Sequence, residues 1–486
     1  MSTANRFCIG ARILAALTIL CLVPLMGTSR LIAASEVPAL QVVVGKSVRL
    51  ELSPAQVLEG DPVTLRVTGL RPGAVVTIHI QSVSLDDAGQ KEPFYGEATF
   101  MADASGTINL ATAPPVRGYY QGADIHGLFW SQRPLAANSA GQAAITALHL
   151  DDPSSVSAHQ AVLTLEEGGT VQDRRVLRFV SNDPDVMRDD VRSDGLIGVF
   201  YCKKGARKRP VVVALGGSEG GLSFADWIGP KLASRGFAVF GLNYFSPPSS
   251  AVAGVPTTLK QIPVELLEKA RGWLKARPEV DIERFGVVGY SKGGEFTLVL
   301  ASSYDWINAA VAYSPSDFVW QGIQYGGGTT NSSWSRAGRD LPFVPTTGTR
   351  EAIAKGRQSG SKIYLAPIAK ANLEAASPER LSAAAIPVER SHAALLLFGG
   401  GDDQLWDCGA SVERAAARLK RAAYPYRYAT VLYPGAGHDL AGTGWRPTTT
   451  DNTDPIQDGG TPEADAHAQA ESWTKMLDFL NRELHP

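Results

Sequence analysis

The sequence has few cysteines, no excess of positive charge and only one long apolar run, near its start. Four cysteines in 486 residues exclude a small disulfide-stabilised scaffold. Lys and Arg number 46 against 48 Asp and Glu, so the chain lacks the basic character of nucleic-acid-binding proteins. Apolar residues make up 44% and charged residues 19%, which is typical of globular proteins and excludes disordered or collagen-like chains. The length allows two or three domains.

The first 34 residues have the pattern of a secretory signal peptide. Arg6 and Arg12 precede the apolar run 13–26, and small residues follow at 27–29 and 33–35. The run has 14 residues and contains Pro24, whereas a membrane-spanning helix needs about 20 apolar residues. We therefore predict cleavage and an exported protein, either periplasmic or extracellular, with no stable membrane span.

Removal of residues 1–34 changes the charge and the cysteine content of the chain. It leaves 43 Lys and Arg against 48 Asp and Glu, a net charge of −5. Only Cys202 and Cys408 remain. An exported protein allows these two cysteines to pair, but two separate buried thiols agree equally well with their distant positions.

Short stretches rich in β-forming residues, separated by turn residues, occupy residues 50–179. This spacing predicts an antiparallel β-sandwich over residues 35–185. The predicted strands are 63–67, 75–83, 97–101, 107–110, 161–165 and 175–179. The stretch 181–195 is polar and rich in helix breakers, so we place the domain boundary there.

From residue 195 to the end, apolar runs alternate with helical patterns. This alternation predicts an α/β domain over residues 195–486 with a mostly parallel sheet and helices on both faces. The predicted strands, expected to be buried on both faces, are 196–202, 211–215, 238–242, 285–288, 309–313, 393–398 and 428–432. Helices are expected at 264–276 and 411–422, and a terminal helix is expected after Thr461 and Pro462. The long connection 314–388 is expected to form a lid or one wall of a substrate pocket.

A serine lies between glycines directly after one of these predicted strands, in Gly289-Tyr-Ser291-Lys-Gly293. A strand before it and a helical stretch after it are the context of a nucleophile elbow. The turn is so tight that the positions two before and two after the serine have almost no room for a side chain. We predict that Ser291 is the nucleophile and stands exposed above the sheet.

A serine nucleophile needs a base and an acid that orients the base. His438 follows a predicted strand in the loop 433–438, and we predict that it is the base. The acid is expected on the loop after the preceding strand, where Asp402 and Asp403 are adjacent; spacing does not choose between them, and Asp407 is a weaker candidate. The order Ser, Asp, His matches that of α/β-hydrolases. The other histidines are assigned to surface or structural roles: His79, His126, His149, His159, His392, His467 and His485.

Acyl transfer also needs backbone donors for the developing oxyanion, each worth about 2.7–4 kcal/mol. The N–H of Lys292 is the first predicted donor. The second is predicted at Gly217 or Ser218, in the Gly-rich loop 216–221 after the strand 211–215. No Gly-Lys-Ser/Thr follows this loop, so a nucleotide-binding loop is disfavoured.

Two further patterns are assigned no role in chemistry. The basic run Lys203, Lys204, Arg207, Lys208 and Arg209 precedes the strand at 211. The run therefore lies at the amino end of that strand, whereas the catalytic loops of such sheets lie at the carboxyl ends of the strands. We therefore predict that it forms a solvated turn and not a binding site for the phosphates of coenzyme A. The sequence has no Cys/His cluster or His-Glu-x-x-His pattern, and no metal site is expected.

Taken together, these residues resemble the family of acyl-CoA thioesterases and bile acid-CoA:amino acid N-acyltransferases. The resemblance extends over nearly all of the chain after residue 34. It is carried by residues 60–70, 95–110, 127–130, 236–239, 289–295, 386–389, 402–403, 433–438 and 460–473.

The resemblance implies a β-sandwich joined to an α/β-hydrolase domain, with no cofactor. It also implies that Ser291, Asp403 and His438 form the triad. Amide-forming members typically use cysteine as nucleophile, so the serine favours hydrolysis of acyl thioesters. Export favours an alternative on the same scaffold, a carboxylesterase or lactonase. A separate and less favoured alternative is a non-catalytic exported binding protein that retains the scaffold.

Overall fold

The computed structural model describes residues 47–85, 91–135, 158–453 and 455–485. The predicted signal peptide, residues 1–34, and His149 lie outside the described residues. None of the helices within the described ranges is both long and apolar enough to cross a membrane.

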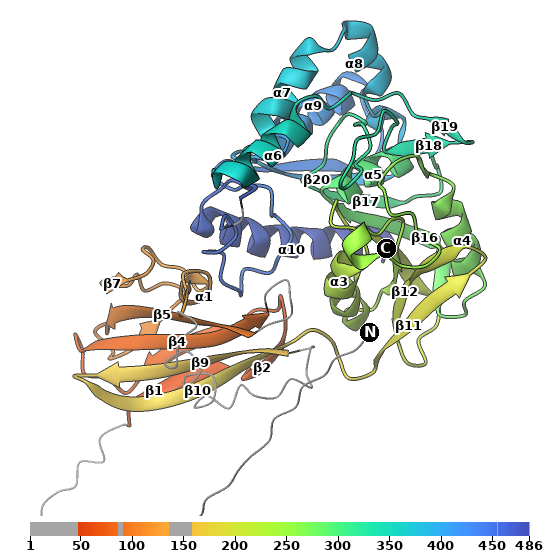
Figure 1. The fold of residues 1–486 in the computed structure, drawn as a ribbon. Helices are drawn as coiled ribbons and strands as arrows, with labels where there is room; N and C mark the ends of the chain where they lie inside the picture. The colour runs from red at the N-terminus through yellow and green to blue at the C-terminus, as the bar shows by residue number, and fades with distance from the viewer. Residues whose placement is uncertain (1–46, 86–90, 136–157, 454, 486) are drawn as a thin grey trace, which may run out of the picture. The chain divides into compact units, whose positions relative to one another are not determined.

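The amino-terminal part is built almost entirely of strands (Figure 1). Three strands form an antiparallel sheet in the order β1-β3-β6, and a second sheet has the order β2-β10-β9-β4-β5-β7, with β8 also pairing with β5. All pairs are antiparallel except β2 with β10, which is parallel and departs from the prediction. The elements are β1 (Arg49–Ser53), β2 (Gln56–Leu58), β3 (Thr64–Thr68), β4 (Val75–Leu85), β5 (Lys91–Met101), β6 (Ile108–Asn109), β7 (Arg117–Gly118), α1 (Gly127–Trp130), β8 (Arg133–Pro134), β9 (Ala158–Glu167) and β10 (Thr170–Val180).

The carboxyl-terminal part contains an eight-stranded sheet in the order β11-β12-β14-β13-β16-β17-β20-β21. The first two pairings are antiparallel and the other five are parallel. This is the α/β-hydrolase arrangement that the sequence predicts. The strands are β11 (Val186–Ser193), β12 (Leu196–Lys203), β13 (Arg209–Leu215), β14 (Ala238–Leu242), β16 (Val280–Tyr290), β17 (Ala309–Tyr313), β20 (Ala394–Gly400) and β21 (Tyr428–Tyr433).

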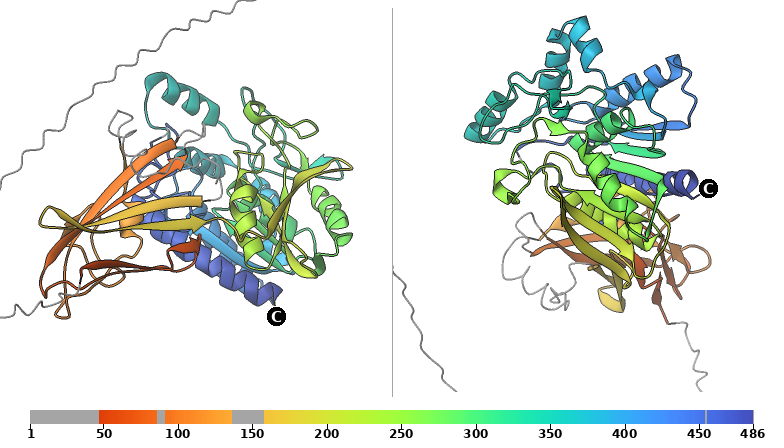
Figure 2. Two further views of the ribbon diagram at one scale, coloured as in Figure 1. Left: turned by 90° about the horizontal axis from the view of Figure 1, so that it is seen from below. Right: turned by 90° about the vertical axis from the view of Figure 1, so that its right-hand side faces the viewer.

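Helices cover both faces of this sheet. On one face, α3 (Ser223–Ser234) and α10 (Pro462–Leu484) pack on apolar side chains of the strands. On the other face lie α4 (Leu266–Lys275), α5 (Lys292–Ala301) and α9 (Cys408–Arg421). Figure 2 shows α10 as the long blue helix that ends at the carboxyl terminus. It begins as predicted, because Thr461 accepts a hydrogen bond from the Ala464 N–H and Pro462 occupies the first turn.

Two expectations about this sheet need correction. The polar stretch 181–195 contains β11, which pairs with β12 along its whole length, so the sheet starts at Val186 rather than after Gly195. Its polar side chains suit an edge strand, where one side faces water. The other edge strand, β21, is only partly buried and not buried on both faces as expected.

The long connection after β17 forms small elements of its own (Figure 1). Near its beginning, β18 pairs in parallel with β15, a two-residue strand from the chain before β16. The elements of this connection are β18 (Trp334–Arg336), β19 (Arg339–Asp340), α6 (Thr349–Ser359), α7 (Ala366–Ala375), α8 (Pro378–Ala384) and the short 3-10 helix η2 (Val388–Arg390). Before β16 lie β15 (Ile262–Pro263) and a second 3-10 helix, η1 (Pro248–Ser250).

Buried charges join the sandwich strands to the hydrolase elements. Glu59, only 2% exposed, lies 3.3 Å from both the Lys231 ammonium and the Arg446 guanidinium. Burial lowers the pKa of Lys231 to about 8, although the Glu59 carboxylate opposes this shift. The two buried charges, Glu59 and Lys231, therefore have each other as partners, as buried charges must, and the half-exposed Arg446 adds a second cation beside Glu59.

Candidate active site

Ser291 occupies a sharp turn between β16 and α5, with φ 56° and ψ −119°. Few residues adopt such a conformation without support from their surroundings. The Ser291 N–H donates to the Tyr313 carbonyl at 2.9 Å, and the Ser291 carbonyl accepts from the Glu295 N–H at 3.0 Å. The turn is therefore held on both sides.

The two glycines of the turn stand where a side chain has no room. A Cβ on Gly289 would lie 2.1 Å from the Gly293 carbonyl oxygen. A Cβ on Gly293 would lie 2.2 Å from the Leu215 carbonyl oxygen and 2.3 Å from that of Gly216. All three obstacles are backbone atoms, so the predicted reason for both glycines is confirmed.

The structure brings Ser291, His438 and Asp403 into one hydrogen-bonded row. The Ser291 Oγ lies 2.8 Å from Nε2 of His438, and Nδ1 of His438 lies 2.9 Å from Oδ2 of Asp403. The three come from the turn after β16, the loop after β21 and the loop after β20. Contrary to prediction, Ser291 is not exposed: its accessible fraction is 7%, because the folded loops close over it.

The two adjacent aspartates have different surroundings. Asp403 is 5% exposed, and besides His438 its carboxylate accepts the N–H groups of Leu405 at 2.8 Å and Cys408 at 3.0 Å. Burial would raise the pKa of Asp403, but His438 and these donors hold it below its usual value. Asp402 is exposed and bonds instead to Gln404 and to the Gly460 N–H. Geometry therefore places Asp403, not Asp402, beside the imidazole.

The third candidate, Asp407, caps a helix. Its side chain accepts the Ala410 N–H at 3.1 Å at the start of α9. This is an ordinary N-cap contact, so Asp407 has a structural role at this end of α9.

His438 lies in a buried setting that also contains aromatic rings. Its ring centroid is 5.5 Å from that of Tyr290 and 5.8 Å from that of Trp406. Burial lowers the pKa of His438, but the Asp403 carboxylate outweighs burial and raises it above 6.5, with smaller contributions from Asp458 and Asp439. A raised pKa suits a base that must hold a proton during a reaction.

Of the three residues predicted to bind an oxyanion, Lys292 and Gly217 lie beside the nucleophile. Lys292 directly follows Ser291. A Cβ on Gly217 would lie 2.9 Å from Cβ of Ser291, so the Gly-rich loop reaches the nucleophile. The Gly217 N–H, however, donates to Oε1 of Glu219 at 2.7 Å and is already engaged. The Ser218 carbonyl is held separately, because it accepts a hydrogen bond from the Tyr325 hydroxyl.

Sequence reasoning did not find Glu219 as part of this site. A Cβ on Gly217 would lie 2.6 Å from Oε2 of Glu219 and 2.9 Å from Cβ of Ser291, so the carboxylate and the nucleophile face the same side of Gly217. Burial raises the pKa of Glu219 above its usual value, although the hydrogen bond from the Gly217 N–H and the nearby His438 both act to lower it. The signal in the sequence was a single carboxylate inside an otherwise Gly-rich loop.

The Lys292 side chain makes a buried ion pair that the sequence did not indicate. Its Nζ lies 2.5 Å from Oε2 of Glu295, and both residues are at most 3% exposed. The other Glu295 oxygen accepts the Trp334 indole N–H at 2.7 Å and the Trp320 N–H at 3.1 Å. The start of α5 is thereby fastened to the long connection after β17.

The thiol of Cys408 lies close to His438 and Asp403. Its sulfur, a His438 nitrogen and an Asp403 oxygen all lie within 4.8 Å of one another, a group that could hold a metal ion. Burial raises the pKa of the Cys408 thiol well above 9. A protonated thiol is a poor metal ligand, because thiolate is the form that binds. Cys408 and Cys202 are separate and buried, which decides between the two alternatives left open by the sequence.

The other predicted structural residues lie away from Ser291. The basic run extends from the last residue of β12, Lys203, over the turn to the first residue of β13, Arg209, at the amino end of β13 as predicted. Lys204, Arg207, Lys208 and Arg209 are exposed. His79 contacts Tyr95, His467 contacts Asp124, and His392 stacks on Tyr426. His126 packs on Trp445, His159 on Phe179 and His485 on Phe237.

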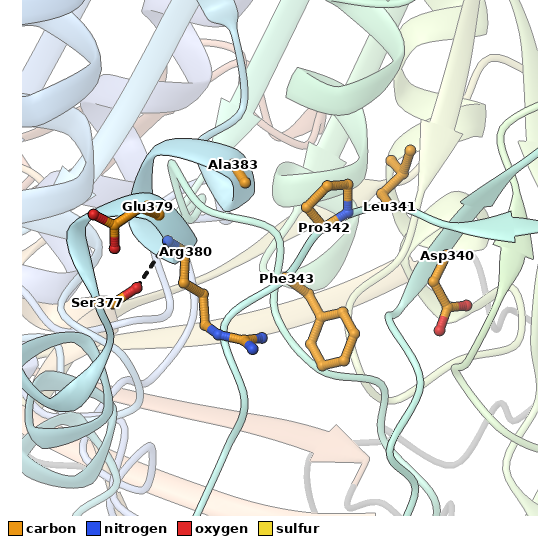
Figure 3. A pocket seen from close by; sticks show the side chains of 8 residues that line it. All are labelled: Asp340, Leu341, Pro342, Phe343, Ser377, Glu379, Arg380 and Ala383. Carbon is orange, nitrogen blue, oxygen red and sulfur yellow. Dashed lines mark hydrogen bonds between the residues drawn. The ribbon is translucent and has the colours of Figure 1, made fainter.

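Two cavities lie in the long connection after β17. One, of about 560 Å³, lies between the loop 321–329 and α6. The other, of about 460 Å³, is shown in Figure 3, where the side chains of Phe343 and Arg380 lie on opposite sides. Its lining, residues 340–343 and 377–383, includes no member of the Ser291 row.

Comparison with protein families finds matches in both parts of the chain. Residues 60–193 match the acyl-CoA thioester hydrolase/BAAT N-terminal region, and residues 262–486 match the BAAT/acyl-CoA thioester hydrolase C terminal. Residues 180–325 also match a PET hydrolase-like family.

Among individual proteins, human acyl-coenzyme A thioesterase 1 is 28% identical over 87% of this chain and 94% of its own length. Mouse acyl-coenzyme A amino acid N-acyltransferase 1 is 26% identical over 90% of this chain and 98% of its own length. A solved α/β-hydrolase from a deep-sea metagenome library, MGS-M1, is 15% identical, covers 63% of this chain and all of its own, and has a TM-score of 0.38.

Proposed function

Because this chain belongs to the acyl-CoA thioester hydrolase and bile acid-CoA:amino acid N-acyltransferase family, a family of enzymes, we propose that it hydrolyses acyl thioesters with Ser291, His438 and Asp403. The observation that supports this most is the continuous row of hydrogen bonds, 2.8 Å and 2.9 Å long, from the Ser291 hydroxyl to the Asp403 carboxylate. A serine on a strained turn, a neutral imidazole and a buried carboxylate together can carry out acyl transfer.

In the first half of the reaction, Ser291 Oγ attacks the thioester carbonyl while Nε2 of His438 takes the hydroxyl proton. The Asp403 carboxylate stabilises the resulting imidazolium through Nδ1–H. The negative oxygen of the tetrahedral intermediate accepts the N–H of Lys292 and, because the Gly217 N–H is engaged by Glu219, that of Ser218. The C–S bond then breaks, and His438 returns the proton to the thiolate.

In the second half, a water molecule attacks the acyl-serine ester. His438 takes one water proton, a second tetrahedral intermediate forms, and the C–O bond to Ser291 breaks. The proton goes back to Ser291 and a carboxylic acid leaves. Serine at this position favours water as the acceptor over the amino group that an amide-forming member would use.

Labelling with a fluorophosphonate tests the proposed nucleophile. We expect the reagent to modify wild-type protein at Ser291 and not to modify Ser291→Ala. Ser302→Ala, at the carboxyl end of the same helix, is the matched control, since its hydroxyl only donates to the Leu298 carbonyl at 2.8 Å. Folded wild-type protein that resists labelling would instead favour a non-catalytic binding protein.

A second candidate function is an exported carboxylesterase or lactonase with the same residues. The observation that favours it is the amino-terminal export pattern, because acyl-CoA is an intracellular metabolite. Comparison of kcat/KM for palmitoyl-CoA with that for p-nitrophenyl palmitate separates the two. A strong preference for the oxygen ester would reject thioester hydrolysis in favour of this candidate.

We also propose that residues 1–34 direct export to the periplasm or beyond. The support is the sequence pattern of two arginines, an apolar run and small residues. Amino-terminal sequencing of mature protein tests it: a new terminus near residue 35 is expected, and an intact Met1 on cytosolic protein would reject export.

A further inference from the structure

The 560 Å³ cavity, here called the α6 cavity, has the size of a small-molecule site, typically about 300–1,000 Å³. Its walls are the loop 321–329, residues 346–351, 353, 354 and 357 in and before α6, and Ile456. It is therefore formed mostly by the long connection after β17, with one residue from the chain before α10.

Both sides of the α6 cavity are joined to the loops around Ser291. On one side, the hydroxyl of the lining residue Tyr325 donates to the carbonyl of Ser218, in the loop that touches the nucleophile. On the other, Ile456 is two residues before Asp458, whose carbonyl accepts the His438 N–H at 2.9 Å. A ligand in the cavity thus lies next to residues that hold the nucleophile and the base.

The chemistry of the lining suits a hydrocarbon chain. Its apolar side chains are Ile323, Ile353, Ala354 and Ile456, with the Tyr325 ring and the glycine backbone beside them. The charged lining residues are Arg350, Glu351 and Arg357. The guanidinium of Arg350 lies 3.6 Å from the carboxylate of Glu351, which offsets part of its charge, and Arg357 is exposed to solvent. A phosphate site would present several unpaired cations or donors instead.

We propose that the α6 cavity binds the acyl chain of the substrate and sets the preference of the enzyme for long chains. This rests on the proposed thioester hydrolysis and adds a place for the substrate's apolar part. The cavity in Figure 3 is the poorer site, because three of its eight lining residues are charged, Asp340, Glu379 and Arg380, whereas three of the nineteen that line the α6 cavity are charged.

Filling the cavity tests the proposal. Ala354→Trp adds bulk to the cavity wall formed by α6, and Ile353→Ser removes apolar surface from that wall. Lys355→Trp is the matched control, because Lys355 is exposed on the same helix and does not line the cavity. We expect Ala354→Trp and Ile353→Ser to lower kcat/KM for dodecanoyl-CoA by about 10-fold or more. The kcat/KM for butanoyl-CoA should stay within about threefold of wild type, and Lys355→Trp should change neither.

A binding measurement separates failure of this proposal from failure of the proposed function. Dodecanoate is titrated calorimetrically into Ser291→Ala with and without Ala354→Trp, and the expected result is binding that weakens about 10-fold or more in the double variant. If wild type hydrolyses no thioester, the proposed function fails, but this weakening still supports the cavity. The cavity proposal is overturned if dodecanoate does not bind, if Ala354→Trp leaves its affinity unchanged, or if butanoyl-CoA turnover falls as much as dodecanoyl-CoA turnover.

Discussion

Replacement of Asp403 by Asn tests the proposed triad most sharply, because Asp402 beside it provides a matched control. The two oxygens of Asp403 accept four N–H groups: Oδ1 accepts those of Leu405 and Trp406, and Oδ2 accepts those of Cys408 and His438. An asparagine has one acceptor oxygen, so its amide NH2 must face the donors of one of these two pairs. An oxygen in the place of Oδ1 keeps two fixed backbone hydrogen bonds. The NH2 is therefore expected to face the imidazole, which would then keep its proton on Nε2 and could not take one from Ser291.

The expected loss in kcat/KM is about 10³–10⁴-fold, the scale seen when the orienting acid of a serine triad loses its charge. This corresponds to about 4–5.5 kcal/mol of transition-state stabilisation, at about 1.36 kcal/mol per decade. Asp402→Asn changes only exposed contacts to Gln404 and Gly460, and it should alter kcat/KM less than about threefold.

The pH profile provides a second readout. His438 acts as base only when neutral, so activity must fall as the pH drops through its raised pKa. Asp403→Asn removes the carboxylate that raises this pKa most, although Asp458 and Asp439 still face the ring. The acid limb of kcat/KM should therefore move to lower pH in Asp403→Asn and stay in place in Asp402→Asn.

The assay is initial-rate hydrolysis of an acyl thioester between pH 5 and 9, with urea unfolding to show that both variants are folded. The reasoning is refuted if Asp403→Asn retains more than about a tenth of wild-type kcat/KM. It is equally refuted if Asp402→Asn is as damaging.

Three further changes test other parts of the site and the fold. Glu219→Ala should lower kcat about 10-fold or more, because it releases the loop 216–221 that the Glu219 carboxylate holds through the Gly217 N–H and so displaces the Ser218 donor. Glu219→Gln keeps an acceptor and should retain most activity, and equal effects of the two variants in steady-state kinetics would contradict this role. Gly293→Ala should lower kcat about 100-fold, because its Cβ meets fixed backbone oxygens and displaces the turn; near-normal rates would show that the turn has room. Glu59→Gln should cost about 3–5 kcal/mol in urea unfolding by leaving the Lys231 ammonium buried without its carboxylate, and a loss below about 1 kcal/mol would contradict that ion pair.

Local patterns in the sequence predicted much of this fold. The apolar runs at 211–215, 285–288 and 309–313 all lie in β13, β16 and β17 of the parallel sheet, because strands covered by helices on both faces need continuous apolar residues. The Gly-x-Ser-x-Gly turn was equally readable, since only glycine fits where a Cβ would meet backbone oxygens.

Other features could not be derived from local pattern. The strand β11 is polar, and only its pairing with β12 identifies it as an edge of the sheet. The contacts of Glu295 with Trp320 and Trp334 and the α6 cavity join segments through packing, and no spacing rule points to them.

The sequence by itself determined which residue types were available and the order of the strands that carry them, because β-strand and turn preferences act over a few neighbouring residues. The tertiary structure decided which carboxylate reaches the imidazole, that the serine is covered rather than exposed, and that both cysteines stay apart. These outcomes depend on how loops far apart in the chain close over one edge of the sheet. A difference of one position, Asp402 against Asp403, turns a side chain from the solvent to the buried ring.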